Sequence, residues 1–201
     1  MLDNMLQTVF RNFSTLFLVV AVLMGPVHLA YTFTYKDVAQ VEELHPYIEN
    51  LPRGRQVQGV GRAVLADARR KFVWVTVAEV LLLPLLVGAT RRVVAVDAAG
   101  GLPGVWDAYR HLATRRVGPA RRMPSPAARL ALLASGVVLA VVIGWLVQTI
   151  GLLGAEVGPD SARWLIAGMS RAIALAAAAP FALVALVAPA PAPAPVSSAP
   201  S

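Results

Sequence analysis

The sequence predicts an all-α polytopic membrane protein, with four transmembrane helices plus short interfacial amphipathic helices. Its residues are 57% hydrophobic and only 14% charged, a composition that excludes an ordinary soluble domain. The apolar residues gather in long blocks, and the clearest of these, residues 72–89, contains Glu79 as its single charge. At about 1.5 Å per residue this block is about 27 Å long, close to the ~30 Å hydrocarbon thickness of a bilayer.

The first span is predicted at residues 13–33, after a short helix. Leu2, Met5 and Val9 recur at helical spacing opposite polar residues, which is typical of a helix lying in the membrane interface. A cleaved signal peptide is the main alternative for this segment. The weakly basic N-terminal region with Asp3, the length of the apolar run and the lack of a small-residue cleavage motif favour a retained anchor.

A polar loop is predicted at residues 36–71, before a second span at residues 72–96. Its first half is acidic and its second half basic, and residues 60–71 are expected to form an amphipathic helix that runs into the span. The acidic half contains possible metal ligands, namely Glu42, Glu43, His45 and Glu49. Pro46 should break the helix that would bring them together, so we expect a solvated acidic loop with no metal.

A basic loop is predicted at residues 97–129. Pro103 suits the start of a helix, and the following residues give one apolar face and a basic opposite face, again typical of an interfacial helix. We expect this loop and the end of the second span to contact anionic headgroups or a protein partner. The residues assigned to that contact are Arg91, Arg92, Trp106, Tyr109, Arg110, Arg115, Arg116, Arg121 and Arg122.

The third and fourth spans are predicted at residues 130–153 and 164–188. The third contains Gly136, Ala140, Gly144 and Gln148 at four-residue spacing, and small residues at this interval let helix backbones approach closely. The fourth span is rich in alanine and carries Arg171. The membrane domain therefore covers residues 1–188, and the Pro-Ala repeat of residues 189–201 predicts a disordered tail.

Polar residues of all four spans are predicted to share one depth. Glu79 and Arg171 each lie about 10 Å inside their helices, and both helices enter from the same side. His28 and Gln148 lie about as deep, measured from the ends of the first and third spans. We expect Glu79 and Arg171 to form an ion pair that His28 and Gln148 complete. A charge in a span is costly, so this polar layer is either a structural clasp or a site for a headgroup, ion or proton.

Charge and topology suggest where the protein lies. The formal net charge of +7 comes from basic residues crowded into the two longer loops, which favours anionic lipid over nucleic acid as the partner. Four spans place both termini on one side. Lysine and arginine are nearly balanced across the membrane, and the clusters at Arg91 and Arg110 favour cytoplasmic termini. We expect a multi-pass protein of the plasma membrane.

No catalytic pattern emerges from the sequence. The chain has no cysteine, and no Ser-His-Asp set, zinc motif or phosphate-binding loop can be assembled, so we expect no enzyme and no cofactor. The leading expectation is an accessory or scaffold subunit that contacts anionic lipid, a membrane-protein partner or a second copy of itself. The alternative is a small transporter or channel component that uses Glu79 and Arg171. A lipid-modifying enzyme ranks third.

Two stretches carry a resemblance to a known group. They are Arg11-Asn12-Phe13 and residues 89–110, where a span is followed by a small-residue turn and a helix ending in Ala108-Tyr109-Arg110. In these the chain resembles uncharacterised bacterial integral membrane proteins similar to the membrane domain of some glycerophosphodiester phosphodiesterases. The resemblance covers about half of the chain and implies a helical membrane module, with no catalytic residue to transfer. A short helix before both the first and third spans also suggests two similar units.

Overall fold

The computed structural model describes residues 2–49, 57–113 and 125–187, and these ranges contain helices and turns but no strand. The helices are α1 (Leu2–Arg11), α2 (Phe13–Glu49), α3 (Val57–Ala98), α4 (Val105–Ala113), α5 (Pro126–Val157) and α6 (Asp160–Val187). Four segments are long and apolar enough to cross a membrane: Phe13–Phe33, Val73–Ala98, Pro126–Val157 and Leu165–Val187. The predicted fold class, an all-α protein with four membrane-spanning helices, is confirmed.

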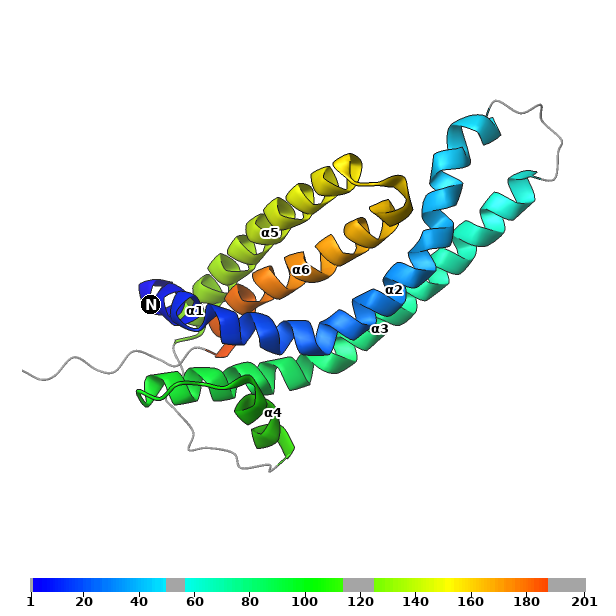
Figure 1. Ribbon diagram of the computed structural model, residues 1–201. Coiled ribbons are helices and arrows are strands. Elements are labelled where there is room, and N and C mark those ends of the chain that lie inside the picture. The colour runs from blue at the N-terminus through cyan, green and yellow to red at the C-terminus, as the bar shows by residue number, and fades with distance from the viewer. Residues whose placement is uncertain (1, 50–56, 114–124, 188–201) are drawn as a thin grey trace, which may run out of the picture.

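The long helices form an open row instead of a closed bundle (Figure 1). α6 packs against α2 and α3 on one side and against α5 on the other, whereas α5 packs extensively only against α6. α1 and the end of α6 lie at the same end of the row, which we call the terminal side; the opposite end, where α2 and α3 rise past the α5–α6 pair, is the loop side (Figure 1).

Glycines on α5 allow it to approach α6 very closely. A Cβ atom on Gly136 would lie 2.5 Å from Ala185 Cβ and 2.7 Å from the Phe181 carbonyl oxygen. One on Gly144 would lie 3.3 Å from Ala178 Cβ, and one on Gly151 would lie 2.1 Å from Ser170 Cβ. The close helix approach predicted from small residues is therefore confirmed at Gly136 and Gly144, and Gly151 extends it.

The segment predicted as a polar loop at residues 36–71 is mostly helical. α2 continues to Glu49 and α3 already begins at Val57, so residues 60–71 are helical as expected but form part of a longer element. Pro46 does not break α2. It lies in the last turn, where its missing N–H removes a single hydrogen bond and little helix follows to be displaced. Residues 50–56 lie outside the described chain.

The two short helices each pack on a long helix of the other half of the chain. α1 lies mainly against α6, with Met5 and Val9 buried, while α4 lies mainly against α3, with Ala108 buried. A Cβ atom on Gly88 of α3 would lie 2.4 Å from the Leu112 side chain of α4, so this contact is also tight. The order of short helix, span, span repeats along the chain as the sequence suggests, with the short helices exchanged between the halves.

The boundaries around α4 and α5 follow from local chemistry. Gly100, with φ of 77°, turns the chain after α3, a conformation that suits glycine. Ser125 caps α5 by accepting a hydrogen bond from the Ala128 amide at 3.4 Å, and Pro126 follows in the first turn, so α5 begins earlier than predicted. The basic loop thus contains α4 and the start of α5, and its residues 114–124, like the tail, lie outside the described chain.

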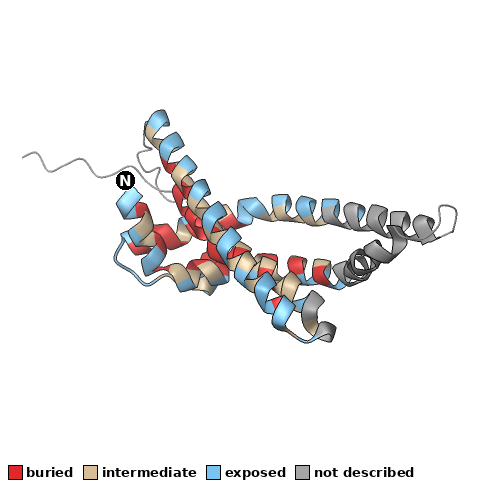
Figure 2. Ribbon diagram, turned by 90° about the horizontal axis from the view of Figure 1, so that it is seen from above, coloured by how far each residue is buried: buried red, intermediate tan, exposed pale blue. Residues whose placement is uncertain are grey.

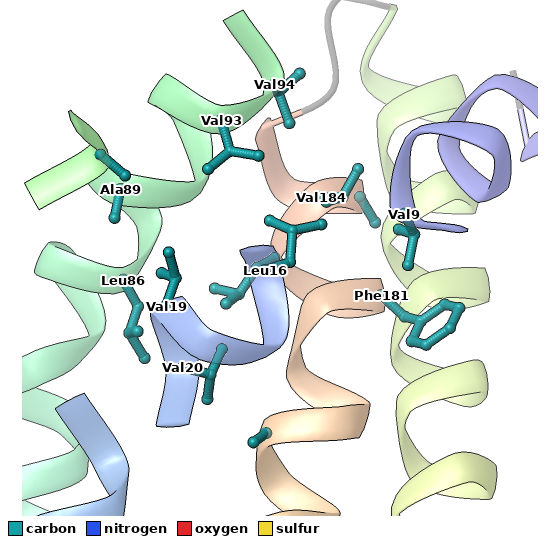
Figure 3. Packing of buried hydrophobic residues seen from close by; sticks show 14 of the residues in the cluster. Val9, Leu16, Val19, Val20, Leu86, Ala89, Val93, Val94, Phe181 and Val184 are labelled. Atoms are coloured by element: carbon teal, nitrogen blue, oxygen red, sulfur yellow. The ribbon is translucent and has the colours of Figure 1, made fainter. Parts of the chain in front are cut away.

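The apolar core lies at the terminal side. Buried residues gather where the helices meet, while their far ends are exposed or not described (Figure 2). Side chains from α1, the start of α2, the end of α3 and the end of α6 point into one space, and Val9 faces Phe181 (Figure 3). The labelled members of this core are Val9, Leu16, Val19, Val20, Leu86, Ala89, Val93, Val94, Phe181 and Val184.

Candidate functional site

The structure brings three of the four predicted polar residues together at the loop-side half of the spans. His28 of α2 is 2% exposed, and its Nε2 atom lies 3.0 Å from Oε1 of Glu79 on α3. Glu79 and Arg171 are both close enough to act on His28 electrostatically. His28, Glu79 and Arg171, together with Tyr31, are called the polar layer below.

The pairing inside the polar layer differs from the predicted one. Among the described residues the carboxylate of Glu79 lies at ion-pair distance from His28, and the expected Glu79–Arg171 ion pair does not form. The guanidinium of Arg171 instead sits over the ring of Tyr31, 5.8 Å from its centroid, in a cation–π arrangement. Equal depth places two residues on one level, but it does not decide which way each side chain faces around its helix.

A close crossing of α2 and α6 positions this layer. Gly168 of α6 lies against Thr32 of α2, and a Cβ atom at Gly168 would be 2.2 Å from the Thr32 hydroxyl oxygen. That hydroxyl is satisfied within α2, because it donates to the His28 carbonyl at 2.7 Å. The crossing therefore brings Arg171, less than one turn further along α6, against the face of α2 that carries His28 and Tyr31.

Gln148 does not belong to the polar layer. It is exposed, on a helix that packs extensively only against α6. The physical reason is helical twist: at about 100° per residue, each four-residue step drifts by about 40°, so by Gln148 the stripe that starts at Gly136 has turned about 120°. Over the seven residues from Gly144 to Gly151 the direction of the side chain rotates around the helix by only about 20°, so both glycines face α6.

A second polar cluster at the terminal side escapes the sequence prediction. Arg11, at the end of α1, donates to the carboxylate of Asp97 near the end of α3. Asp97 is 7% exposed and Arg11 is 59% exposed. The Asn12 amide lies beside the same carboxylate and donates to the Thr8 carbonyl at 3.0 Å. The hydrogen bond and charge of Asp97 raise the pKa of Arg11, so the guanidinium keeps its charge.

Two hydrogen bonds join the same region to the α3–α4 connection. The Tyr109 hydroxyl donates to the Val19 carbonyl of α2, and the Thr15 hydroxyl donates to the Pro103 carbonyl at 3.2 Å. Burial raises the pKa of Tyr109 to about 12. Tyr109 was predicted to lie at headgroup depth, but its hydroxyl is used inside the protein. The sequence contains a signal for this pair: Arg11 lies just before the first span and Asp97 at the end of the second, so both are at the same depth on the terminal side.

The remaining predicted headgroup residues are divided between exposed and undescribed positions. Arg91, Trp106 and Arg110 are exposed, Trp106 at 79%, and Leu102 beside them is 99% exposed. Arg92 donates through Nε to Oδ2 of Asp107 at 2.9 Å. The other four, Arg115, Arg116, Arg121 and Arg122, lie outside the described chain.

Neither a search for metal-binding clusters nor comparison with known proteins assigns a function to this chain. Among the residues whose side chains the structure describes, no cluster of at least three metal-binding groups is found. The side chains of residues 34–49, which include Glu42, Glu43, His45 and Glu49, lie outside that set. No protein-family model matches the chain, and neither a curated protein nor a solved structure matches it significantly. Its chemistry must therefore be argued from the arrangement of its own residues.

Proposed function

We propose that this protein is a non-enzymatic accessory or scaffold subunit of the cell membrane, which docks anionic lipid headgroups on its terminal side. One observation carries the proposal: α4 packs against α3 with Ala108 buried, while Trp106 and Arg110 of α4 are exposed, as are Leu102 just before α4 and Arg91 of α3. An aromatic ring and an aliphatic side chain beside exposed guanidinium groups suit the boundary between acyl chains and headgroups.

Electrostatics favours anionic lipid as the partner of this surface. Each basic residue near an anionic leaflet contributes about 1 kcal/mol of attraction. The sequence of the same loop also contains Arg115, Arg116, Arg121 and Arg122, which lie outside the described residues. Because the cytoplasmic leaflet carries most anionic lipid, the proposal includes cytoplasmic termini.

Lipid retention tests the docking surface. The protein is purified in mild detergent, mixed with defined phosphatidylglycerol and phosphatidylcholine, and analysed by native mass spectrometry. We expect preferential phosphatidylglycerol binding that falls several-fold in an Arg91→Gln/Arg110→Gln variant. Arg70→Gln is the matched control, because Arg70 is an exposed basic residue near the loop side. Equal losses in both variants would contradict a dedicated surface.

Orientation is tested with single cysteines, since the chain has none of its own. Gln7→Cys on α1 reports the terminal side, and Arg70→Cys on α3 reports the loop side; both positions are exposed. A membrane-impermeant maleimide applied to intact cells should label the Arg70→Cys variant at once and the Gln7→Cys variant only after permeabilisation. The reverse pattern would contradict cytoplasmic termini.

The accessory role implies a membrane-protein partner, and α5 is the best-placed surface for it. Because α5 packs extensively only on α6, much of its circumference is exposed, including Val141, Trp145 and Leu146. A photo-crosslinker at Trp145 should give one defined adduct, to another protein or to a second copy. The same probe at Val80, an exposed position on α3, serves as control. Crosslinking to lipid alone at both positions would count against the accessory role.

A second candidate function is favoured by the polar layer. An ionisable group within a span costs at least about 3 kcal/mol on insertion scales, so buried His28 beside Glu79 suits a small transporter component. This candidate predicts proton flux. Vesicles that carry the protein and a pH-sensitive dye should acidify faster under an inward proton gradient than vesicles with a Glu79→Gln variant. Equal rates would exclude proton transport.

A further inference from the structure

His28 is an ionisable side chain that is buried within a membrane-spanning segment. It is 2% exposed, yet neither of its ring nitrogens has a hydrogen bond of good geometry. Its Nε2 atom nevertheless lies 3.0 Å from Oε1 of Glu79, whose side chain is 28% exposed. A buried imidazole left without a full hydrogen bond is costly unless it has a second state that satisfies it.

Few groups face His28 among the described residues. From α3 it meets Glu79, from α6 the charge of Arg171, and on its own helix Tyr31 lies beneath that guanidinium. Thr32 does not donate to the ring, because its one hydroxyl proton goes to the His28 backbone carbonyl. The imidazole is therefore a buried group with one carboxylate at 3.0 Å and one guanidinium nearby.

We propose that His28 and Glu79 together bind one exchangeable proton inside the membrane. In the unloaded state a neutral imidazole, the Glu79 carboxylate and the Arg171 guanidinium sum to no net charge. Taking a proton from hydronium forms one N–H or O–H bond, releases one water molecule and leaves the layer with one positive charge. At 3.0 Å the proton can reside on either partner, as imidazolium with carboxylate or as neutral imidazole with carboxylic acid.

Access and placement support a proton more than a larger ligand. Glu79 is the less buried member of the pair and His28 the more buried one, so a proton that reaches the pair meets the carboxylate first. The Nε2 atom of His28 and Oε1 of Glu79 are 3.0 Å apart, a separation that a shared proton bridges and that holds no larger group between the two atoms. The inference rests on the second candidate function, since it names what the same site would carry.

Proton counting tests the site at equilibrium. Purified protein in lipid nanodiscs is taken from pH about 8 to about 5, a window around the ordinary histidine value, and the protons taken up per chain are measured. Because one proton is shared, His28→Gln and Glu79→Gln should each lose the same single proton, and the double variant should lose no more than either one. Loss of two protons in the double variant, or of none in any variant, would overturn the proposal.

A control variant and a second measurement separate the possible causes. Gln148→Leu is the control, because Gln148 lies outside the polar layer and carries no titratable group, so this variant should leave the proton count unchanged. If a variant does not fold, infrared difference spectra of the unmodified protein decide the question, because the imidazole and carboxyl bands must change at one common pH. Changes at separate pH values would overturn the site. A shared proton without flux in the vesicle assay would retain the site and remove the transport function.

Discussion

The two ends of the molecule differ in the kind of side chain that they bury. At the terminal side, side chains from all six helices contribute to an apolar core, with Arg11 and Asp97 paired at the same end of the molecule. At the loop side, an ionisable residue, His28, is buried and Glu79 lies beside it. Burial of apolar surface therefore stabilises one end, while the other end keeps groups whose burial is costly. Stability and chemistry are separated along the spans.

The largest effect is expected at the packed end. Gly136→Val adds atoms where a Cβ already meets Ala185 and the Phe181 carbonyl, and backbone cannot rotate away, so we expect a loss of about 3 kcal/mol. Gly154→Val, on the same helix with no atom within 4 Å of its Cβ position, should be neutral or slightly stabilising. Thermal unfolding in mild detergent measures both. Similar midpoints for the two variants would mean that the close contact between α5 and α6 at Gly136 does not contribute to stability.

A smaller loss is expected at the loop side. Gly168→Val pushes α6 away from Thr32, and we expect a cost of about 2 kcal/mol together with loss of the Arg171–Tyr31 contact. Gly25→Val on α2 is the control, because its Cβ position is open. Tyrosine fluorescence and the thermal midpoint report the two effects. A normal midpoint in the Gly168→Val variant would show that the polar end can open without cost.

Tyr109→Phe should remove about 1 kcal/mol at neutral pH, the value of one hydrogen bond to the Val19 carbonyl. The pKa of Tyr109 is raised by burial from 10.0 to about 12, so its neutral form is favoured by folding. This contribution is complete below the lower value and is lost as the pH rises through the higher one. The free energy of unfolding, measured as the pH is raised from 10.0 to about 12, should fall more steeply in the native protein than in the Tyr109→Phe variant.

The smallest effect is expected at the surface of α4. Arg92 and Asp107 are 35% and 50% exposed, so their ion pair is screened by water and salt. Arg92→Gln should change the free energy of unfolding by less than about 0.5 kcal/mol. Chemical denaturation at low and high salt checks this value. A large loss that shrinks at high salt would mean that α4 is held by charge, contrary to the packing of Ala108 and Leu112.

Much of the fold follows from the sequence, because span length and composition depend on the bilayer and not on neighbouring residues. The four spans fall close to their predicted positions, and the approach of α5 at Gly136 follows from residue size. The continuation of α2 past Pro46 to Glu49 could not be predicted in this way, because the sequence does not show that the helix ends only three residues after that proline.

The site is predicted less completely, since a sequence gives depth but not direction. His28, Glu79 and Arg171 were placed on one level and do gather there. Which of them pair depends on how far each helix is rotated, and that is fixed by packing at Gly168. Gln148 shares the depth but has turned away from α6.

The position of α1 bears on how the chain assembles in a bilayer. Val9 and Phe10 find their neighbours on α6, where the rings of Phe10 and Phe181 meet edge to face with centroids 5.9 Å apart. A ribosome completes α1 long before α6 emerges. Asp97 of α3 can pair with Arg11 earlier, but the apolar face of α1 lacks its main neighbour until α6 is inserted, so we expect α1 to reach its final position last.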